Sequence, residues 1–245
     1  MKFKFLKSVF TGLILSASCI ANAGLIGHWD ANGNAQDSTG NNNGTLEGNT
    51  TFTTGNDGQA FLFDGNSDSV LVGTTLDVST GFSLSAWINP LSYGERQIFN
   101  NESSYEMAVR GSTLQFAIET DAAGGWFWVD TGINVSLNSW SFFGLTYDGI
   151  SSKIYGELGQ QLFSTNVISG NVIDPANDQV HIGARLGNTS SFHGSIDDVY
   201  VFDHALTAND IALVASNSYS DVPEPSTLAI FALGMIGLAS RRFKK

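Results

Sequence analysis

Apolar and polar residues alternate over short stretches between residues 24 and 222. The segment 82–89 places Phe82, Leu84, Ala86 and Ile88 on one face of an extended chain. Segments 113–118 and 153–158 have the same period of two. Since neighbouring strand side chains point to opposite faces, this pattern predicts strands with a buried face. Other predicted strands span residues 25–29, 60–63, 69–72, 97–100, 105–109, 140–147, 179–182 and 195–202. About a dozen short strands between Gly- and Asn-rich turns predict an all-β protein, an antiparallel β-sandwich.

One short helix is predicted near the end of the strand-rich region. Thr207 is suited to cap its N-terminus, and Asp210 lies in its first turn. Ile211, Leu213 and Val214 are expected to form a buried face against one side of the sandwich. The domain is therefore predicted to span residues 24–215, and the polar residues 216–222 to form a linker.

The N-terminal 23 residues have the features of a secretory signal peptide. Three lysines precede an apolar run at residues 9–20, and Ala21 and Ala23 are small residues of the kind that signal peptidase recognises. A lipoprotein signal is the alternative, with Cys19 as acceptor, but Ser16 stands where that signal requires leucine. Cleavage after Ala23 would leave an exported domain without cysteine, which excludes disulfides and a thiol nucleophile.

The C-terminal segment 223–245 combines three features. It begins with Pro223-Glu224-Pro225, continues with an apolar run at residues 228–239 and ends with a basic cluster that includes Arg241 and Arg242. The run is shorter than the ~20 residues that comfortably span a bilayer as a transmembrane helix. The basic cluster should remain on the cytoplasmic side. A single tail-anchor helix and a sorting signal are both compatible with this arrangement.

The region between these two ends is strongly acidic. Residues 24–222 contain four cationic residues and 22 of the 23 acidic ones, which gives a net charge of −18. Such a surface repels nucleic acids and anionic polymers, so no nucleic-acid partner is expected. A neutral glycan or a divalent cation is the better partner, although the charge also serves solubility.

The C-terminal segment resembles a bacterial PEP-CTERM sorting tail, since Pro-Glu-Pro-Ser, an apolar segment and Arg-Arg occur in that order. The resemblance implies that an exosortase cuts near Pro-Glu-Pro. The chain would then be an exported protein of a Gram-negative bacterium, tethered transiently to the inner membrane. Its destination would be the cell surface or the exopolysaccharide matrix.

The strand-rich region resembles the laminin-G-like, concanavalin A-like jelly-roll domains. The resemblance rests on Gly27-His-Trp29-Asp30, Ala60-Phe-Leu-Phe-Asp-Gly65, Phe82-Ser-Leu-Ser-Ala-Trp87-Ile, Trp140 to Asp148 and Phe192 to Val199, in that order. One departure is Tyr155-Gly-Glu-Leu-Gly159, where the family usually has an aromatic residue followed by x-Asp-Gly. This departure puts a ligand role of that turn in doubt and leaves the fold expectation intact.

A structural calcium ion is one expectation. Asp37 and the Asn-rich loop 41–44 offer the hard oxygen ligands that calcium prefers. The resemblance implies that the ion ties the first loop to the last strand, through Asp37, Asn42 and Asp197. Since neighbouring strand residues point to opposite faces, Asp198 is an alternative to Asp197. The competing interpretation is a simple turn, with Asp197 as a hydrogen-bond acceptor.

A carbohydrate platform is a second expectation. Trp126 and Trp128 should lie on one strand face, which Asp130 continues. Flat aromatic rings stack on the C–H faces of sugars, and Arg96 and Arg110 could donate hydrogen bonds from neighbouring strands. The competing interpretation is that both rings cover the core.

Catalysis is not expected. The Glu-x-Asp-x-Glu type patterns of sandwich-fold glucanases are missing, and the nearest stretch, Glu119-Thr-Asp121, lacks a second glutamate. The sequence therefore predicts a non-catalytic surface or matrix protein that binds carbohydrate or matrix protein, with a role in adhesion or biofilm formation. The alternatives are a secreted glycoside hydrolase or lyase of sandwich fold and a purely structural matrix protein.

Overall fold

The computed structural model describes residues 24–73, 76, 78–122, 125–126, 128–173 and 179–219. The predicted signal peptide and the sorting tail, with Pro223, Glu224, Pro225, Arg241 and Arg242, lie outside these residues. Within the described part of the chain, no helix is both long and apolar enough to cross a membrane.

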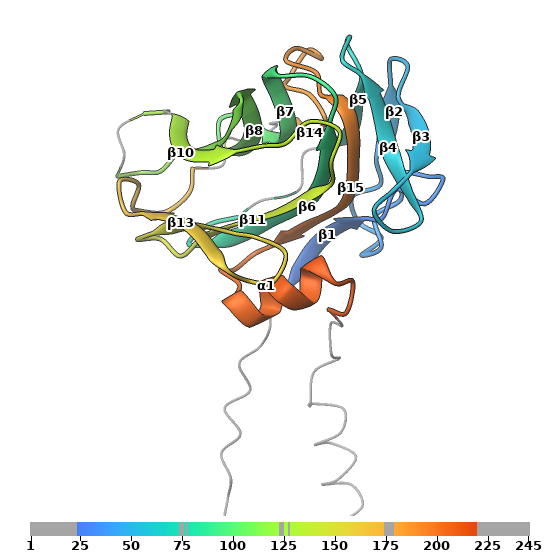
Figure 1. Ribbon diagram of the computed structural model, residues 1–245. Coiled ribbons are helices and arrows are strands. Elements are labelled where there is room, and N and C mark those ends of the chain that lie inside the picture. Colours follow the sequence, from blue (N-terminus) through green and yellow to red (C-terminus); the bar gives the residue numbers. More distant parts are fainter. Residues whose placement is uncertain are drawn as a thin grey trace, which may run out of the picture. The chain divides into compact units, whose positions relative to one another are not determined.

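Two antiparallel sheets form a sandwich, as the sequence predicts (Figure 1). Sheet A has eight strands in the order β13-β12-β11-β6-β15-β4-β3, with β1 paired to β15. Its strands are β1 (Leu25–Trp29), β3 (Thr51–Thr54), β4 (Gln59–Asp64), β6 (Phe82–Pro90), β11 (Ser141–Tyr147), β12 (Ser152–Tyr155), β13 (Gln161–Thr165) and β15 (His193–Phe202).

Sheet B has seven strands in the order β10-β9-β8-β7-β14-β5-β2. Its strands are β2 (Thr45–Glu47), β5 (Ser69–Gly73), β7 (Gly94–Asn101), β8 (Tyr105–Gly111), β9 (Thr113–Ile118), β10 (Trp128–Asn134) and β14 (Val180–Ile182). The main hydrophobic core fills the space between the sheets, and every second residue of the central strands points into it.

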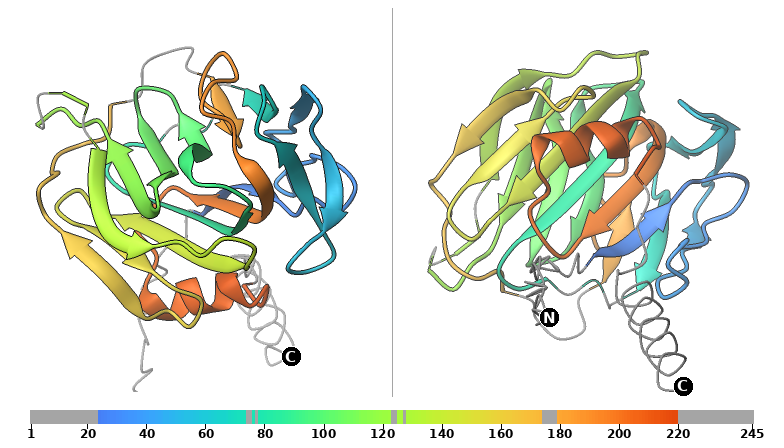
Figure 2. Two further views of the ribbon diagram at one scale, coloured as in Figure 1. Left: turned by 45° about the horizontal axis from the view of Figure 1, so that its top comes forward. Right: turned by 90° about the horizontal axis from the view of Figure 1, so that it is seen from below.

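Helix α1 (Ala208–Ala215) covers the outer face of sheet A, as both views from other directions confirm (Figure 2). Trp87 of β6 points to this side, and its Nε1 donates to the carbonyl of Ala215 at 3.2 Å. Trp87 packs in a second apolar cluster with Phe142, Tyr200, Phe202 and residues of the helix. Both faces of the central strands β6, β11 and β15 are therefore buried.

The predicted cap of α1 is present. The Thr207 side chain accepts from the Asp210 backbone, and the Asp210 carboxylate accepts from the backbone N–H of Thr207, a capping box. Ile211 and Val214 are fully buried. The prediction for Leu213 is wrong, because it lies on the solvent side of the helix and is 45% exposed. A short helix on a flat sheet buries a narrow stripe only.

Glycine lets the helix approach the sheet closely. A Cβ atom at Gly144 of β11 would lie 2.9 Å from Cδ1 of Ile211, which is closer than real Cβ contacts allow. The absence of a side chain at Gly144 therefore sets the distance between α1 and sheet A.

Several strand bounds differ from the sequence prediction. Strand β12 ends at Tyr155, because Gly156 and Gly159 form the turn into β13 with a 3.0 Å hydrogen bond from Gly159 N to Gly156 O. Strands β2, β3 and β13 were not predicted, since they are short and mostly polar edge or near-edge strands that bury few side chains.

Strand β15 changes its partner halfway. Its first half pairs with β4 as far as Ile196, and its second half pairs with β1 from Val199 onward. Between them the register to β6 shifts, and Asp198 has a left-handed φ of 48°. This bulge places Asp197 and Asp198 at the point where β15 stops pairing with β4 and begins to pair with β1.

The packing of α1 makes a direct prediction about stability. Ile211→Ala should destabilise the chain by ~2–5 kcal/mol, because it removes a buried side chain and leaves a cavity against sheet A. Leu213→Ala, the matched control on the solvent side, should cost less than ~1 kcal/mol. Urea unfolding measures both, and equal losses would contradict the described orientation of the helix.

Candidate functional site

The outer face of sheet B is the first candidate region. In β8, Tyr105, Met107 and Val109 point into the core, so Glu106 and Arg110 point outward. Outward positions of an exposed sheet are ordinarily polar and solvated. Here Glu106 is completely buried, which marks this face as more than a solvated surface.

One row of side chains crosses this face from edge strand β10 to β14. The residues stand directly opposite one another in register on adjacent strands: Trp128, Ala117, Glu106, Asn100 and His181. We call this set the transverse row. Ala117 of the row is fully buried, and the hollow beside Trp128 lies next to the row, over Ala108 of β8.

The hollow is small, about 10 Å³, and Trp128 and Arg110 line it together with Gln97, Ala108 and Arg185. The Arg110 guanidinium carbon lies 4.5 Å from the centre of the Trp128 ring, a cation–π contact that covers one ring face. Arg110 is also ion-paired with Glu95. The hollow thus combines an aromatic ring, two guanidinium groups and an amide over an alanine floor.

The two tryptophans of the predicted platform are neighbours without being coplanar. Their ring centres are 6.4 Å apart, and the rings are nearly perpendicular at 88°. The prediction of one flat face requires that both tryptophans lie in the same strand. Trp126 precedes β10, so the alternation of strand side chains does not apply to it. Both rings are half-buried, and together they form a corner.

The remaining platform residues divide between two places. Asp130 is exposed on β10 near Trp128, and its Oδ1 accepts from the backbone of Gly132 at 2.9 Å. Arg96 pairs with Val109 in register, so its side chain points away from Arg110, and its Nη1 donates to the carbonyl of Ser191 at 3.0 Å. Trp126, Trp128, Asp130 and Arg110 are therefore brought together, and Arg96 is not.

Two carboxylates approach each other on the same face. Arg185 Nη2 donates to Glu102 at 2.8 Å and lies 3.3 Å from Glu106 Oε1, while Gln97 donates to the other oxygen of Glu106 at 2.9 Å. Burial raises the pKa of Glu106 to about 7, although the positive charge of Arg185 opposes the shift. A close pair of carboxyl groups resembles the requirement of a glycosidase, but the guanidinium of Arg185 occupies the space between them.

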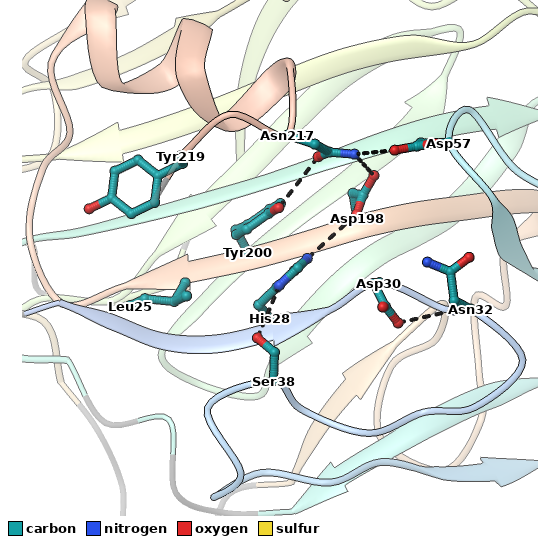
Figure 3. Close-up of a pocket in the computed structure, with 10 residues that line it drawn as sticks. All are labelled: Leu25, His28, Asp30, Asn32, Ser38, Asp57, Asp198, Tyr200, Asn217 and Tyr219. Carbon is teal, nitrogen blue, oxygen red and sulfur yellow. Dashed lines mark hydrogen bonds and ion pairs between the residues drawn. The ribbon is translucent and has the colours of Figure 1, made fainter. Parts of the chain in front are cut away.

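The second candidate region is a pocket of about 360 Å³ between β1, β15 and the segment after α1 (Figure 3). Its lining is acidic and aromatic: Leu25, His28, Asp30, Asn32, Ser38, Asp57, Asp198, Tyr200, Asn217 and Tyr219. The rings of His28 and Tyr200 are stacked with centres 3.8 Å apart. With three carboxylates and no lysine or arginine in the lining, this pocket repels anions.

Asn217 ties the acidic wall of the pocket together (Figure 3). Its side-chain N–H₂ donates to Asp57 at 3.1 Å and to Asp198 at 2.9 Å. Asn217 has a left-handed φ of 51°, and its N–H donates to the Val214 carbonyl at the end of α1. The helix end thus holds the first loops of the chain against the bulge of β15.

Asp197 lies buried at this bulge. One of its carboxylate oxygens accepts from the backbone N–H groups of Asn56 and Asp57, at 2.8 and 3.2 Å. Burial and the charge of Asp198 raise the pKa of Asp197 to about 7. The expectation that Asp197 and Asp198 point to opposite faces is wrong, because the left-handed Asp198 interrupts the alternation. Asp197 accepts from the backbone N–H of Asp57, and Asp198 lines the same pocket as Asp57.

The three residues predicted to hold calcium do not converge. Asp37 accepts from the N–H groups of His28, Thr39 and Asn42, so its own loop uses its oxygens. The Asn42 side chain donates to the Ile26 carbonyl. Among the described residues, no group of three or more His, Cys, Asp or Glu side chains is arranged to hold a metal ion. Structural calcium stays a prediction, which a calcium titration followed by thermal unfolding tests.

Four residues of the two candidate regions are not among the site residues that the sequence predicts: Glu106, Asn100, His181 and Asn217. Glu106 was detectable, since it alternates with the apolar residues of β8. His181 and Asn100 were not, because only the register between β14 and β7 brings them together. Asn217 lies in the predicted linker, and no local sequence pattern indicates that it lines the pocket.

Comparison with protein families gives two matches. Residues 63–212 match the concanavalin A-like lectin/glucanases superfamily, and residues 221–245 match the PEP-CTERM protein-sorting motif. Both confirm the resemblances found in the sequence. A comparison with curated protein sequences gave no match.

Solved structures with the same fold include binding domains. Domain 4 of AbnA, an extracellular arabinanase from Geobacillus stearothermophilus in complex with arabinotriose, has a TM-score of 0.65 at 20% identity, over 78% of this chain and 98% of that domain. The receptor-binding domain of a botulinum neurotoxin C/D mosaic has a TM-score of 0.60 at 19% identity, over 79% of this chain. This chain covers 51% of that toxin domain. At these identities the likeness shows the fold.

The buried Asp197 predicts a pH dependence of stability. A carboxyl whose pKa rises on folding stabilises the folded chain below its unfolded pKa near 4, and this contribution is lost as the pH rises through about 7. Asp197→Asn, which keeps an oxygen acceptor and carries no charge, should raise Tm at pH 8 by several °C, and by much less at pH 4, where the parent carboxyl is protonated in the folded chain. Thermal unfolding at both values measures this.

Asp130→Asn is the control, because it removes one charge from an exposed aspartate. An equal gain in this control at pH 8 would show a general charge effect and contradict the assigned role of Asp197.

Proposed function

The chain belongs to the concanavalin A-like lectin/glucanase superfamily, and from that premise we propose that it is a non-catalytic carbohydrate-binding protein of the cell surface. The sorting motif indicates an exported protein that is directed to the cell surface. The ligand is a neutral glycan, and it binds on the outer face of sheet B beside Trp128.

The hollow beside Trp128 carries this proposal. Sugar recognition requires an apolar surface for C–H faces and polar groups for hydroxyls, in a concave site. Trp128 and Ala108 supply the apolar part, while Arg110 supplies donors and Gln97 supplies a donor and an acceptor. Because Arg110 covers one face of the Trp128 ring, the ligand contacts the other face or the ring edge.

Related structures support a carbohydrate ligand. Besides the arabinotriose complex of the AbnA domain, a binding domain of botulinum neurotoxin DC was solved in complex with SialylT. These ligands belong to those proteins, and we extend only their class to this chain. The net charge of −18 between residues 24 and 222 favours a neutral glycan over an anionic one.

A glycoside hydrolase is the second candidate, and the proximity of Glu102 and Glu106 is the observation that favours it. Glu106 has no exposed surface, and Arg185 contacts both carboxyl groups. A substrate oxygen would have to displace that guanidinium before either carboxyl could reach it. Binding without turnover is therefore the better-supported function.

The sorting tail extends the proposal to localisation. An exosortase would remove the segment that follows Pro223-Glu224-Pro225 after transient tethering in the inner membrane of a Gram-negative bacterium. The released domain would act in the exopolysaccharide matrix, in adhesion or biofilm formation. Mass spectrometry of the mature protein should find neither Arg241 nor Arg242, and their retention in a host with an exosortase would contradict this step.

A glycan array with the purified full-length chain tests the binding function. We expect binding to one or more neutral glycans, and Trp128→Ala should weaken it about tenfold, equivalent to ~1.4 kcal/mol. The matched control is Leu158→Ala, which removes the most exposed large apolar side chain, in the turn between β12 and β13 (81% exposed). This control should bind normally.

Asp57→Asn separates the two candidate regions, since Asp57 lines the pocket of Figure 3 between two strands of sheet A, while Trp128 begins an edge strand of sheet B. If Asp57→Asn abolishes binding while Trp128→Ala does not, the site is the pocket. If the parent chain binds no glycan, the purely structural role in the matrix replaces the proposal.

A further inference from the structure

The transverse row contains hydrogen-bonding groups that the described residues leave unused. His181 is 2% exposed and Asn100 is fully buried, yet Nε2 of His181 and Oδ1 of Asn100 have no hydrogen-bond partner among the described residues. His181 Nδ1 faces Ser69 and Glu47, so the edge that carries Nε2 faces away from them. Buried polar atoms without partners are rare and call for an explanation.

A hairpin covers this part of the row. Residues 185–190 fold back on themselves, with Arg185 N donating to the Thr189 carbonyl at 2.9 Å, and lie above sheet B at the top of Figure 1. We call this segment the latch hairpin. Gly187 and Asn188 close its tip with left-handed φ angles.

The latch hairpin is held to the sheet by polar side-chain contacts, through Arg185 at its first residue and Asn188 at its tip. Arg185 binds Glu102 and Glu106, and Asn188 accepts from Ser69 at 2.9 Å. Leu186, its one large apolar side chain, is 48% exposed. The ends of the hairpin are better fixed, since Ser190 accepts from the Gln97 backbone at 2.9 Å. A tip without buried apolar contacts can open at low cost in free energy.

We propose that the latch hairpin covers the second half of the glycan-binding groove, and that a longer oligosaccharide displaces Arg185 and binds along the transverse row from Trp128 to His181. This proposal rests on the proposed function. The ligand class becomes a neutral oligosaccharide of several units that lies across the strands, rather than a single terminal sugar.

Length and chemistry agree with this assignment. Five strands carry the row, and four spacings of about 4.8 Å give it a length of roughly 19 Å. A groove of that length, opened by movement of the latch hairpin, would accommodate several sugar units. Sugar hydroxyls both donate and accept, so they can satisfy Nε2 of His181 and Oδ1 of Asn100. When Arg185 leaves, Glu106 can retain a proton and accept or donate as a neutral acid.

Thiol labelling tests the latch independently of any glycan. In a full-length chain with Cys19→Ser, the variant His181→Cys places one thiol beneath the hairpin, and Ser69→Cys is a second such position. Adding Arg185→Gln should raise the rate of labelling by a neutral reagent at least tenfold at either position. Lys153→Gln, which removes one positive charge from sheet A, should leave the rate unchanged. Equal rates with and without Arg185 would overturn the latch.

Binding of arabinan-, glucan- and mannan-derived oligosaccharides of two and six units then tests the groove. Arg185→Gln should strengthen binding of a six-unit ligand about fivefold or more without changing that of its two-unit form. Adding Asn100→Ala should abolish the gain. Equal effects on both lengths, with binding still dependent on Trp128, would overturn the groove and leave the proposed function standing. Failure of every oligosaccharide to bind the parent chain would contradict both.

Discussion

The burial of both faces of the central strands of sheet A is the constraint on which the rest of the structure depends. Its inner face packs on sheet B and its outer face on α1 and the aromatic cluster around Trp87. The centre of sheet A therefore has no room for a ligand, and the pocket of Figure 3 lies beside it, where β1 pairs with β15. Among the described residues, no helix covers the outer face of sheet B. The latch hairpin covers part of it, and polar and aromatic side chains gather there (Figure 1).

Strand pairing within sheet A explains the acidic pocket of Figure 3. Strand β15 serves two partners, β4 and β1, and it can do so only through the bulge at Asp197 and Asp198. The Asp197 carboxylate at the bulge accepts hydrogen bonds from backbone N–H groups that lie outside the strands, such as that of Asn56. At the pocket of Figure 3 the segment after α1 is held to the rest of the domain, because Asn217 donates to both Asp57 and Asp198.

The sequence predicted the architecture well and the sites only in part. Alternation identified central strands such as β9 to the residue, and capping chemistry identified α1, because both signals are local. The transverse row depends on the register between strands far apart in sequence, as between His181 and Asn100, and no local pattern encodes it. The platform prediction failed for Arg96 because its side chain follows the inward alternation of β7 at that position.

The central claim is that the outer face of sheet B binds the ligand. Nuclear magnetic resonance of the isotope-labelled chain, titrated with the oligosaccharide that it binds best, tests it most directly. The account predicts that the indole signal of Trp128 and backbone signals of β8, β9 and β10 shift together and saturate at one affinity. Shifts confined to residues around the pocket, such as Asp30 and Asn217, with the Trp128 signal unchanged, would contradict it.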